Sequence, residues 1–395
     1  MTDTTAKIQS SRLLSLDILR GITIAGMILV NNPGSWGSIY APLRHAPWNG
    51  LTPTDLVFPF FMFIMGISTY FSLRKYDFKA SYSSVWKIVK RTLVILLIGW
   101  GIGWFGMFLR GVMNPDVQLA DAVFTFDHIR LLGVLPRLAL CYGVSAIVAL
   151  TMKYRHIIWL VGALLVAYTI LLLTGHGYEF SDANIISIVD HKVLGESHMY
   201  RDTIDGVSLK FDPEGLLSTI PSIAHCLIGF LCGGLIVGTA DNRDRCNKLF
   251  IVGAVLTFAG FLLSYGLPIN KKIWSPTFVF TTCGLASTLL ALLIWIIDIR
   301  GHRRWCTFFH SFGINPLFLY CLSAVLAICF GAIRVPLAAS ETGHVSITTL
   351  LYKYTLTPLC GGDTTLASLI YAILFVMLCW SVGYILYKKK IYIKI

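Results

Sequence analysis

Charged residues are scarce in this sequence. They make up only 13% of its 395 residues, whereas 56% are apolar or aromatic. A soluble globular domain carries roughly 25% charged residues, and half that density leaves too little polar surface to cover a soluble protein of this size. The composition therefore excludes a soluble fold and predicts a protein surrounded by lipid. Linkers rich in Pro, Gly or Ser, low-complexity tracts and clear internal repeats are also missing, so we expect a single transmembrane domain over 1–395.

Three further absences reduce the number of possible functions. The ten cysteines show no metal spacing such as paired CxxC, and most lie inside apolar runs, where a thiol packs as a small hydrophobe; we therefore expect no metal. No nucleic-acid-binding motif accompanies the net charge of +12, and we expect no nucleic-acid partner. The first apolar run carries Asp17 and Arg20 and lacks a clear small-residue cleavage site, so we expect no cleavable signal peptide.

Long apolar stretches are abundant instead. A spanning helix needs about 20 mostly apolar residues, because its backbone groups must be satisfied within the segment. The pattern predicts an all-α, polytopic membrane bundle of about ten transmembrane helices. The ten stretches are 14–31, 55–73, 88–108, 131–151, 157–174, 215–237, 249–267, 277–298, 312–330 and 366–387.

The distribution of lysine and arginine predicts the orientation. One set of alternate loops, which includes the N-terminus, 74–91 and the tail KKKIYIKI, holds twice as many of these residues as the other set. The positive-inside rule then places both termini in the cytoplasm. The long loop 175–214 falls outside and is acidic. Such a loop suits a cationic ligand, but solvation alone also explains its charge.

Ionisable residues inside apolar runs are costly, so each is a functional candidate. Asp17 and Arg20 lie three residues apart, hence on one helix face. They form either an internal ion pair that fixes the first helix or a site where arginine faces a phosphate-bearing ligand. Arg137 raises the same alternatives, beside Pro136, where a kink often opens a cavity.

The region 30–66 holds the most informative polar residues. An apolar helix ends near Asn31, and the next begins at Thr52-Pro53-Thr54-Asp55, a strong helix-start signal. The aromatic residues between them, such as Trp36, are typical of interface anchors. His45 lies among hydrogen-bonding side chains between the two helix ends. It is either a hydrogen-bonded loop histidine or a general base, since its unperturbed pKa near 6.5 suits proton transfer at neutral pH.

Several of these segments together resemble a known family. The segments are LDILRGITIAGMILVNNPG, LRHAPWNGLTPTDLVFPFFMFIMG, RLLGVLPRLALCY, FDPEGLLSTIPSI, LPINKKIWSPTFVF and GINPLFLY. Their content and order resemble the heparan-α-glucosaminide N-acetyltransferase family, bacterial homologues included. Compared with the animal members, an amino-terminal lumenal domain and an extra first span are missing, so we expect the bare membrane core.

The resemblance implies a membrane acetyltransferase. It would take the acetyl group of cytosolic acetyl-CoA and pass it to the amine of a glucosamine-type sugar on the far side of the membrane. It also implies a homodimer and, for this bacterial-looking chain, the bacterial inner (cytoplasmic) membrane. The family's histidine maps onto His45 and its asparagine onto Asn31. The loop between these two residues is longer here than in the animal members.

These implications give each candidate residue a predicted role. His45 would act as the general base or carry the acetyl group itself, and Asn31 would donate to the thioester oxygen. Arg20 and Arg137, with Asp17, would bind the cofactor near the cytoplasmic side. The candidates for binding the sugar are Asn49, Asp55, Asp212, Glu214 and Lys271.

Some of these roles have a simpler explanation, and two other functions fit the pattern. Asp212 and Glu214 precede a predicted helix, where acidic residues also act as caps. A transporter of an amino sugar would suit ten helices with intramembrane charges, although inverted repeats are missing. An O-acyltransferase would use the same cofactor on a different acceptor atom.

Overall fold

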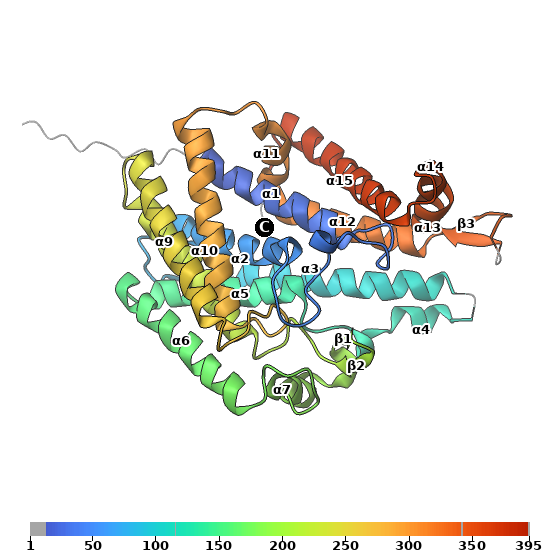
Figure 1. Cartoon of the computed structure of the whole chain (residues 1–395), viewed down its shortest axis with the longest axis horizontal. Helices are drawn as coiled ribbons and strands as arrows, with labels where there is room; N and C mark the ends of the chain where they lie inside the picture. Colours follow the sequence, from blue (N-terminus) through green and yellow to red (C-terminus); the bar gives the residue numbers. More distant parts are fainter. Residues whose placement is uncertain (1–12, 115, 341–342, 394–395) are drawn as a thin grey trace, which may run out of the picture.

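The computed structural model describes residues 13–114, 116–340 and 343–393. The chain is almost entirely helical (Figure 1). Its long helices are α1 (Leu14–Asn31), α2 (Pro53–Leu73), α3 (Tyr82–Val112), α5 (Val134–Thr151), α6 (Tyr154–Thr174), α8 (Thr219–Val237), α9 (Asn242–Leu263), α10 (Pro276–Leu293), α12 (Pro316–Ala332) and α15 (Thr364–Lys388).

Shorter elements fill the connections. They are α4 (Leu119–Val123), α7 (Ile185–Leu194), α11 (Cys306–Ile314), α13 (Ile347–Thr349) and α14 (Thr357–Leu359), two π-helical turns (Ile294–Ile299 and Leu350–Leu356) and four 3-10 turns (Ala41–Leu43, Arg74–Tyr76, Phe126–His128 and Glu196–His198). Two antiparallel hairpins complete the described chain: β1 (Arg201–Ile204) with β2 (Val207–Lys210), and β3 (Arg334–Pro336) with β4 (His344–Ser346).

Within the described residues, nine helices are long and apolar enough to cross a membrane, and a bent pair, α11 with α12, makes a tenth span if it is counted as one. The predicted all-α, multi-pass membrane bundle is therefore confirmed. The predicted boundaries agree to within a few residues for most spans. The helix predicted over 88–108 is longer, because α3 runs from Tyr82 to Val112.

The span predicted over 312–330 contains a break near its start. The chain bends by 86° between α11 and α12. Proline disfavours the helical conformation at the residue before it, and Asn315, which precedes Pro316, has φ −122° and ψ 55°. The break therefore follows from the Asn-Pro pair, which an apolar composition averaged over 20 residues hides.

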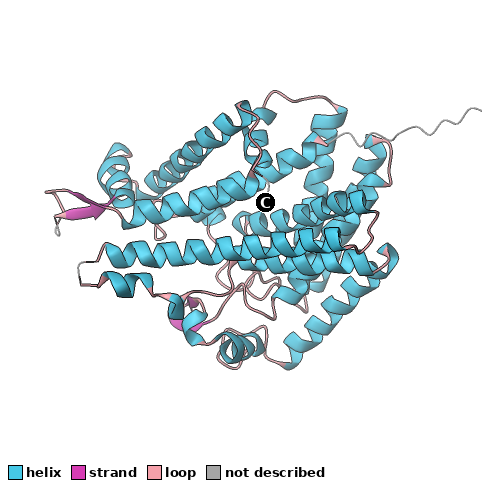
Figure 2. Ribbon diagram, turned by 180° about the vertical axis from the view of Figure 1, so that it is seen from behind, coloured by secondary structure: helices cyan, strands magenta, loops and turns pink. Residues whose placement is uncertain are grey.

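Five helices form the core of the bundle. In α1, α2, α5, α8 and α10, between 61% and 67% of the most apolar window is buried, against 11% in α3 and 17% in α9. Glycine allows the closest approach, since a Cβ at Gly66 of α2 would meet the carbonyl oxygen of Cys226 in α8 at 2.0 Å. Small residues permit such packing where both helices are surrounded by lipid. Figure 2 shows the bundle from behind, built almost entirely of helices.

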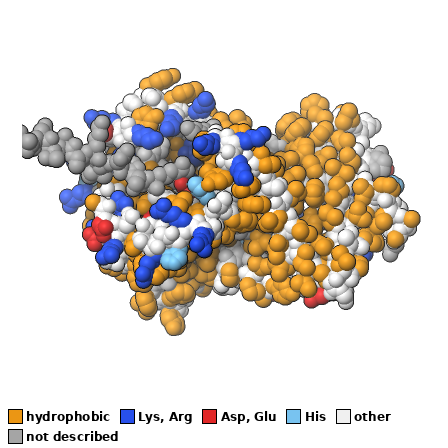
Figure 3. Space-filling model, turned by 90° about the horizontal axis from the view of Figure 1, so that it is seen from above, with side chains coloured by type: hydrophobic (Ala, Val, Ile, Leu, Met, Phe, Trp, Pro, Cys, Tyr) orange, Lys and Arg blue, Asp and Glu red, His pale blue; other side chains and the backbone are white. Residues whose placement is uncertain are grey.

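The surface divides into two parts. Figure 3 shows lysine and arginine side chains over one half of the visible face, and an almost continuous apolar surface over the other half. The apolar half is the surface that lipid contact requires. The separation agrees with a membrane protein that has one basic end.

The predicted acidic loop 175–214 is an ordered cover rather than an open loop. It contains α7 and the β1–β2 hairpin, and it folds back onto the region of His45. Trp48 donates its Nε1–H to the carbonyl of Tyr178 at 2.7 Å and packs against Phe180 and Phe211. The loop therefore forms one wall around the candidate site.

Candidate active site

A helix cap fixes the position of His45. Thr52 is the N-cap of α2, and its side chain and that of Asp55 form a capping box. Oδ2 of Asp55 accepts from the backbone N–H groups of Thr52 and Ala46, both at 3.1 Å, and Oδ1 lies 2.7 Å from Nδ1 of His45. A contact this short requires a hydrogen between the two atoms, so Nδ1–H donates to Asp55. The lone pair of the neutral ring is therefore on Nε2.

Lys271 reaches the same histidine from a distant loop. Its Nζ lies 3.0 Å from Nδ1 of His45, 3.4 Å from Nε2 and 3.5 Å from Oδ1 of Asp55. Since Nδ1–H and the ammonium are both donors, the 3.0 Å contact is a close approach of charge and not a hydrogen bond. The structure thus brings together three of the predicted residues in one constellation of carboxylate, imidazole and ammonium.

The loop that carries Lys271 is anchored to the loop that carries His45. The backbone N–H of Gly50 donates to the carbonyl of Ile269 at 2.8 Å, and Nδ2 of Asn270 donates to Oδ1 of Asn49 at 3.2 Å. The predicted residue Asn49 therefore lies beside the constellation, with its side chain used in this contact. The pairing fixes the two loops relative to each other.

Burial shapes the charge of Lys271. Its side chain is only 17% exposed. Burial lowers its pKa below the ordinary value, although the negative charges of Asp55 and Glu214 act in the opposite direction. Lys271 is therefore a mostly desolvated donor whose charge depends on two nearby carboxylates.

Asp212 and Glu214 bind an arginine that sequence reasoning did not single out. Arg130 forms ion pairs with both carboxylates and stacks on the ring of Tyr200. Burial opposes the charge of Glu214, but Arg130 holds the pKa of that carboxyl below its ordinary value. Burial also opposes the charge of Arg130, but the two carboxylates hold its pKa above the ordinary value. Asp212 also accepts from the backbone N–H of Tyr200. Asp212 is fully buried, and its carboxylate oxygens are engaged in these contacts. Its role here is therefore structural.

Arg130 carried a signal that could have been used. It is the first residue of the segment RLLGVLPRLALCY, which also contains the predicted site residue Arg137. Its position just outside the apolar run made it resemble an ordinary loop arginine. Only the contact with Asp212, 82 residues away, distinguishes it.

The two arginines predicted to bind the cofactor together lie at opposite ends of the bundle. Arg137 is fully buried near the His45 end, where it donates to the carbonyl of Gly215 at 3.0 Å and to the hydroxyl of Ser218. Its guanidinium also lies 5.3 Å from the ring centre of Trp274. The two arginines therefore do not share one position, because α5 begins at the His45 end and Arg137 is in its first turn.

Arg20 lies at the other end. It donates to Asp17 at 3.1 Å, to the hydroxyl of Ser68 in α2 at 2.8 Å and to the carbonyl of Gly313 in α11 at 3.4 Å. The pair thus connects α1 to two other helices, as an internal ion pair would. The cofactor role of these residues stays a prediction.

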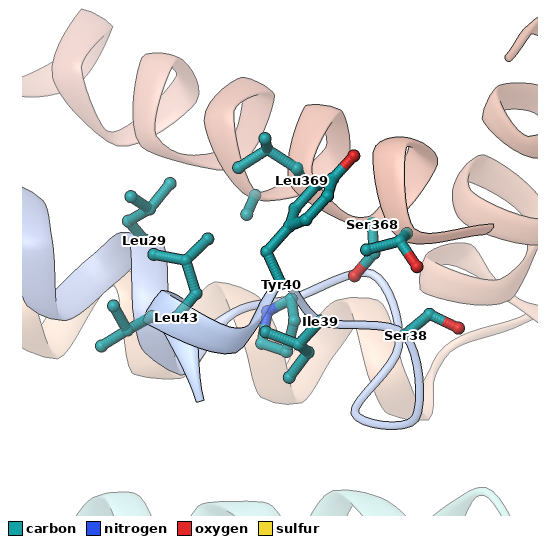
Figure 4. Close-up of a pocket in the computed structure, with 11 residues that line it drawn as sticks. Leu29, Ser38, Ile39, Tyr40, Leu43, Ser368 and Leu369 are labelled. Carbon is teal, nitrogen blue, oxygen red and sulfur yellow. The ribbon is translucent and has the colours of Figure 1, made fainter. Parts of the chain in front are cut away.

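Asn31 is not joined to the constellation. It is the last residue of α1 and is exposed, and across the described ranges no hydrogen bond connects it to His45. The chain after it packs against α15 instead, where Tyr40, Leu29 and Leu369 line a small, mostly apolar pocket (Figure 4). The hydroxyl of Ser368 accepts the backbone N–H of Ser35 at 3.1 Å. The catalytic role of Asn31 stays a prediction.

A second buried carboxyl was also missed. Asp190 of α7 is fully buried, and its Oδ1 accepts the backbone N–H of Leu216 at 2.8 Å. Burial raises the pKa of Asp190 to about 7. In the part of the chain that the structure describes, no group of three His, Cys, Asp or Glu side chains is arranged to hold a metal ion.

Comparison with known proteins gives two related sequences. The chain is 27% identical to the heparan-alpha-glucosaminide N-acetyltransferase of Mus musculus, over 99% of this chain and 62% of that protein. It is 28% identical to the Homo sapiens protein of the same name, over 78% of this chain and 52% of that protein. The chain thus spans between about half and three fifths of the length of these relatives. No family model matches the sequence.

Proposed function

We propose, on the premise that this chain is a distant relative of the heparan-alpha-glucosaminide N-acetyltransferases, that it transfers the acetyl group of acetyl-CoA to the amine of a glucosamine-type sugar. The observation that carries the proposal is the constellation of His45, Asp55 and Lys271. A base, a residue that orients the base and a cation converge there. These are the groups that acyl transfer to an amine requires.

His45 supplies the base. Asp55 holds its Nδ1–H, so Nε2 is available to remove a proton from the attacking amine. The new bond joins the amine nitrogen to the acetyl carbon, the bond from that carbon to sulfur breaks, and the thiolate leaves with its electron pair. The proton on Nε2 can then pass to the departing thiolate. Free CoA and the N-acetylated sugar are the products, and the imidazole returns to its neutral form.

Lys271 supplies positive charge where the thioester oxygen gains negative charge. Its Nζ is 3.4 Å from Nε2 of His45, so a reacting carbon near Nε2 lies within reach of both groups. Donors placed at a developing oxyanion contribute about 10²–10³ to the rate. Asn31, which with a backbone N–H was the other candidate for the oxyanion role, is exposed at the end of α1. We therefore assign this role to Lys271 in our mechanism.

A covalent route through His45 is the alternative within the same function. In that route Nε2 attacks the thioester carbon, the carbon–sulfur bond breaks, and CoA leaves as the thiolate, so that acetyl-imidazole forms. The amine then takes the acetyl group from Nε2 and releases the imidazole. Removing a general base costs about 10²–10⁴ in rate, so a direct-transfer enzyme without His45 keeps measurable activity. An enzyme that needs acetyl-His45 keeps none above background.

Glu214 and Asn49 are the proposed contacts of the sugar. Glu214 lies close enough to Lys271 to affect its charge, and an ammonium or hydroxyl of the sugar is a suitable partner for a carboxylate. Asn49 has its amide nitrogen left for such a contact, since its Oδ1 accepts from Asn270. Asp212 already binds Arg130 and the backbone of Tyr200, and so holds this part of the outer loop in place.

The proposed topology supports this chemistry. With both termini in the cytoplasm, His45 lies at the outer end of the bundle, and acetyl-CoA approaches from the basic inner end. CoA is too highly charged to cross a bilayer, so its thioester must reach through the bundle to the site. We propose the bacterial inner membrane as the location, and the homodimer stays a prediction.

The direct test measures acetyl transfer by purified protein. Wild type, His45→Ala and His176→Ala receive radiolabelled acetyl-CoA and glucosamine, and labelled N-acetylglucosamine is counted. His176 is a matched control, since it also contacts a carboxylate, Glu179, at 3.2 Å but lies exposed in the outer loop. We expect full activity from wild type and His176→Ala, and a loss of at least about 10²-fold from His45→Ala.

Other outcomes separate the remaining hypotheses. An undiminished rate in His45→Ala would overturn the mechanism. A base-labile ester product would identify an O-acyltransferase, whereas an amide supports the proposal. Accumulation of glucosamine in sealed vesicles without consumption of acetyl-CoA would identify the transporter.

A further inference from the structure

A basic groove lies on the surface of the bundle, between the first turns of α9 and the π-helical turn that follows α10. Because α10 begins just after the loop of Lys271 and ends at this groove, the groove lies at the end of the bundle opposite His45. It has a volume of about 580 Å³, and the residues that line it are Arg243, Cys246, Asn247, Trp295, Ile299 and Arg300. Two guanidinium groups, an amide and an indole therefore surround one groove, and such donors bind anions.

Both arginines of the groove are available to a ligand. In the part of the chain that the structure describes, neither guanidinium forms a hydrogen bond or an ion pair with another side chain or with the backbone. Arg300 lies over the ring of Trp295, 4.9 Å from its centre, a contact that leaves its N–H groups unused. Other basic side chains nearby are already engaged. Arg245 donates to the carbonyl of Thr239 at 2.7 Å, and Lys248 donates to the hydroxyl of the same residue at 3.1 Å.

Acidic residues near the groove do not cancel its charge. Asp241 caps α9 by accepting from the backbone N–H groups of Arg243 and Asp244, so the first turn of α9 is already satisfied by the protein. Asp244 is exposed and Asp298 is partly buried, and neither lines the groove. Since none of the described residues that line it is acidic, the groove takes its charge from the two arginines.

The groove does not lead into the bundle. Behind it, α9 and α10 lie side by side (Figure 1) and approach closely. A Cβ at Gly253 would meet the hydroxyl oxygen of Thr288 at 2.2 Å, and one at Gly260 would meet that of Thr281 at 2.3 Å. A ligand in the groove therefore has no path between these two helices to His45, and the groove is separate from the proposed site of acetyl transfer.

The groove continues instead onto the apolar outer face of α9. Ile251, Val255 and Phe258 follow Asn247 at intervals of three or four residues, so they lie on one face of the helix, and all three are exposed. From Asn247 to Phe258 the helix rises by about 17 Å, close to the depth of one leaflet in a hydrocarbon core about 30 Å thick. A lipid with its headgroup in the groove can therefore place an acyl chain along this face.

We propose that this groove binds the headgroup of an anionic phospholipid of the phosphatidylglycerol type. Arg243 and Arg300 contact the phosphate, whose oxygens match the planar fork of a guanidinium, and Asn247 contacts the hydroxyls of the glycerol. Trp295 lies at the depth where aromatic residues meet the headgroups. Basic pockets between helices on the cytoplasmic side recognise anionic headgroups in this way, and the proposed topology places the groove on that side. The inference goes beyond the proposed function and does not depend on it.

The test measures binding of defined lipids to the purified full chain in detergent by native mass spectrometry. Dioleoyl phosphatidylglycerol is titrated into wild type, Arg243→Gln/Arg300→Gln and Arg74→Gln/Arg155→Gln. The last variant is the matched control, because it removes the same charge from two exposed arginines at the same end of the bundle, outside the groove. We expect the Kd for the first bound lipid to rise at least about 10-fold in the groove variant, as the loss of charge-assisted hydrogen bonds predicts. In the control variant this Kd should stay at the wild-type value.

Two further ligands distinguish an anionic lipid from other sources of phosphate. Dioleoyl phosphatidylcholine has the same acyl chains, but its quaternary ammonium cancels the charge of the phosphate. We expect it to bind wild type at least about 10-fold more weakly than phosphatidylglycerol. Glycerol 3-phosphate has the anionic group without the chains. It should bind at least about 10²-fold more weakly than the lipid, because it has no apolar surface to bury against α9.

A charge-keeping variant separates the loss of a ligand contact from damage to the fold. Arg243→Lys/Arg300→Lys should lose less affinity for phosphatidylglycerol than the glutamine variant, since lysine keeps the charge but not the planar fork. Without lipid, both groove variants should unfold at the wild-type temperature, because the two arginines are exposed. An equal loss of affinity in the groove and control variants would mean that only the overall charge of this end attracts the lipid, and would overturn the proposal. Equal affinities of wild type for phosphatidylglycerol and either of the other two ligands would also overturn it.

Discussion

The two ends of the bundle organise their polar residues differently. At the His45 end, each reactive side chain has a fixed geometry: a capping box holds Asp55, Asp55 holds His45, and paired loops hold Lys271. At the opposite end, lysines 388–390 are exposed, and Asn315 holds the backbone of Ile391 and Ile393, which follow them. The difference matches the function proposed for the His45 end, because bond-making needs groups placed within fractions of an ångström.

The largest effect is expected at Asp55, which both orients His45 and belongs to the capping box of α2. Asp55→Asn removes the acceptor that fixes the tautomer of His45, and we expect kcat to fall by about 10²–10⁴. The same change also removes a negative charge from the first turn of α2, which costs about 0.3–1 kcal/mol. Asp241→Asn is the control, because Asp241 caps α9 through two backbone N–H groups without a histidine. If both variants lose activity equally, the cap alone explains the effect.

The second largest effect is expected when the positive charge of Lys271 is removed. Lys271→Met keeps the length of the side chain and removes its donors, and we expect kcat to fall by about 10²–10³ with little change in the KM for glucosamine. Lys272→Met is the neighbouring control, because Lys272 pairs with Asp202 in the outer wall. A change confined to the KM for glucosamine would mean that Lys271 binds the sugar instead.

Stability of the His45 end should depend on pH through Asp190. Its pKa is raised from 3.8 to about 7 in the folded protein, so the folded state holds the proton more tightly than the unfolded state. The contribution of Asp190 to stability is therefore greatest below about pH 4 and falls as pH rises toward 7, by a few kcal/mol in total. Thermal unfolding of wild type and Asp190→Asn across this range checks the sign. A wild type that gains stability from this carboxyl as pH rises would contradict the assignment.

The smallest effect is expected at the opposite end. Arg20→Gln should lower the free energy of unfolding by about 1 kcal/mol, because it removes an ion pair within α1 and hydrogen bonds from α1 to α2 and α11. Unfolding in detergent and the KM for acetyl-CoA, measured on the same variant, separate structure from binding. A rise of more than 10-fold in that KM with unchanged stability would make Arg20 a phosphate ligand. Fixed side chains would then contact substrate at both ends of the bundle.

Local patterns predicted much of the fold. The scarcity of charge and the apolar runs predicted a multi-pass helical bundle, because a helix in lipid must satisfy its own backbone. The start of α2 was predicted from Thr52-Pro53-Thr54-Asp55, since a capping box depends only on residues three apart. The Asn315-Pro316 pair indicates the break between α11 and α12. The apolar composition averaged over the whole run does not reveal it.

The candidate site was predicted as separate residues and not as an arrangement. His45, Asp55 and Lys271 were each selected, yet nothing local joins a histidine to a lysine 226 residues away. Arg130 was overlooked because its partners lie more than 80 residues along the chain. Arg137 was expected at the same end as Arg20, but composition gives only the burial of a helix and not which neighbours its first turn meets.

The sequence by itself determined which segments enter the membrane, where most of them begin and which residue types are costly there. Each of these depends on solvation and on hydrogen bonds within a few residues. Only the tertiary structure decided that the loop with Lys271 lies against the loop with His45 and that Asn315 holds the tail. Such contacts depend on how whole helices pack, and packing is a property of all their surfaces at once.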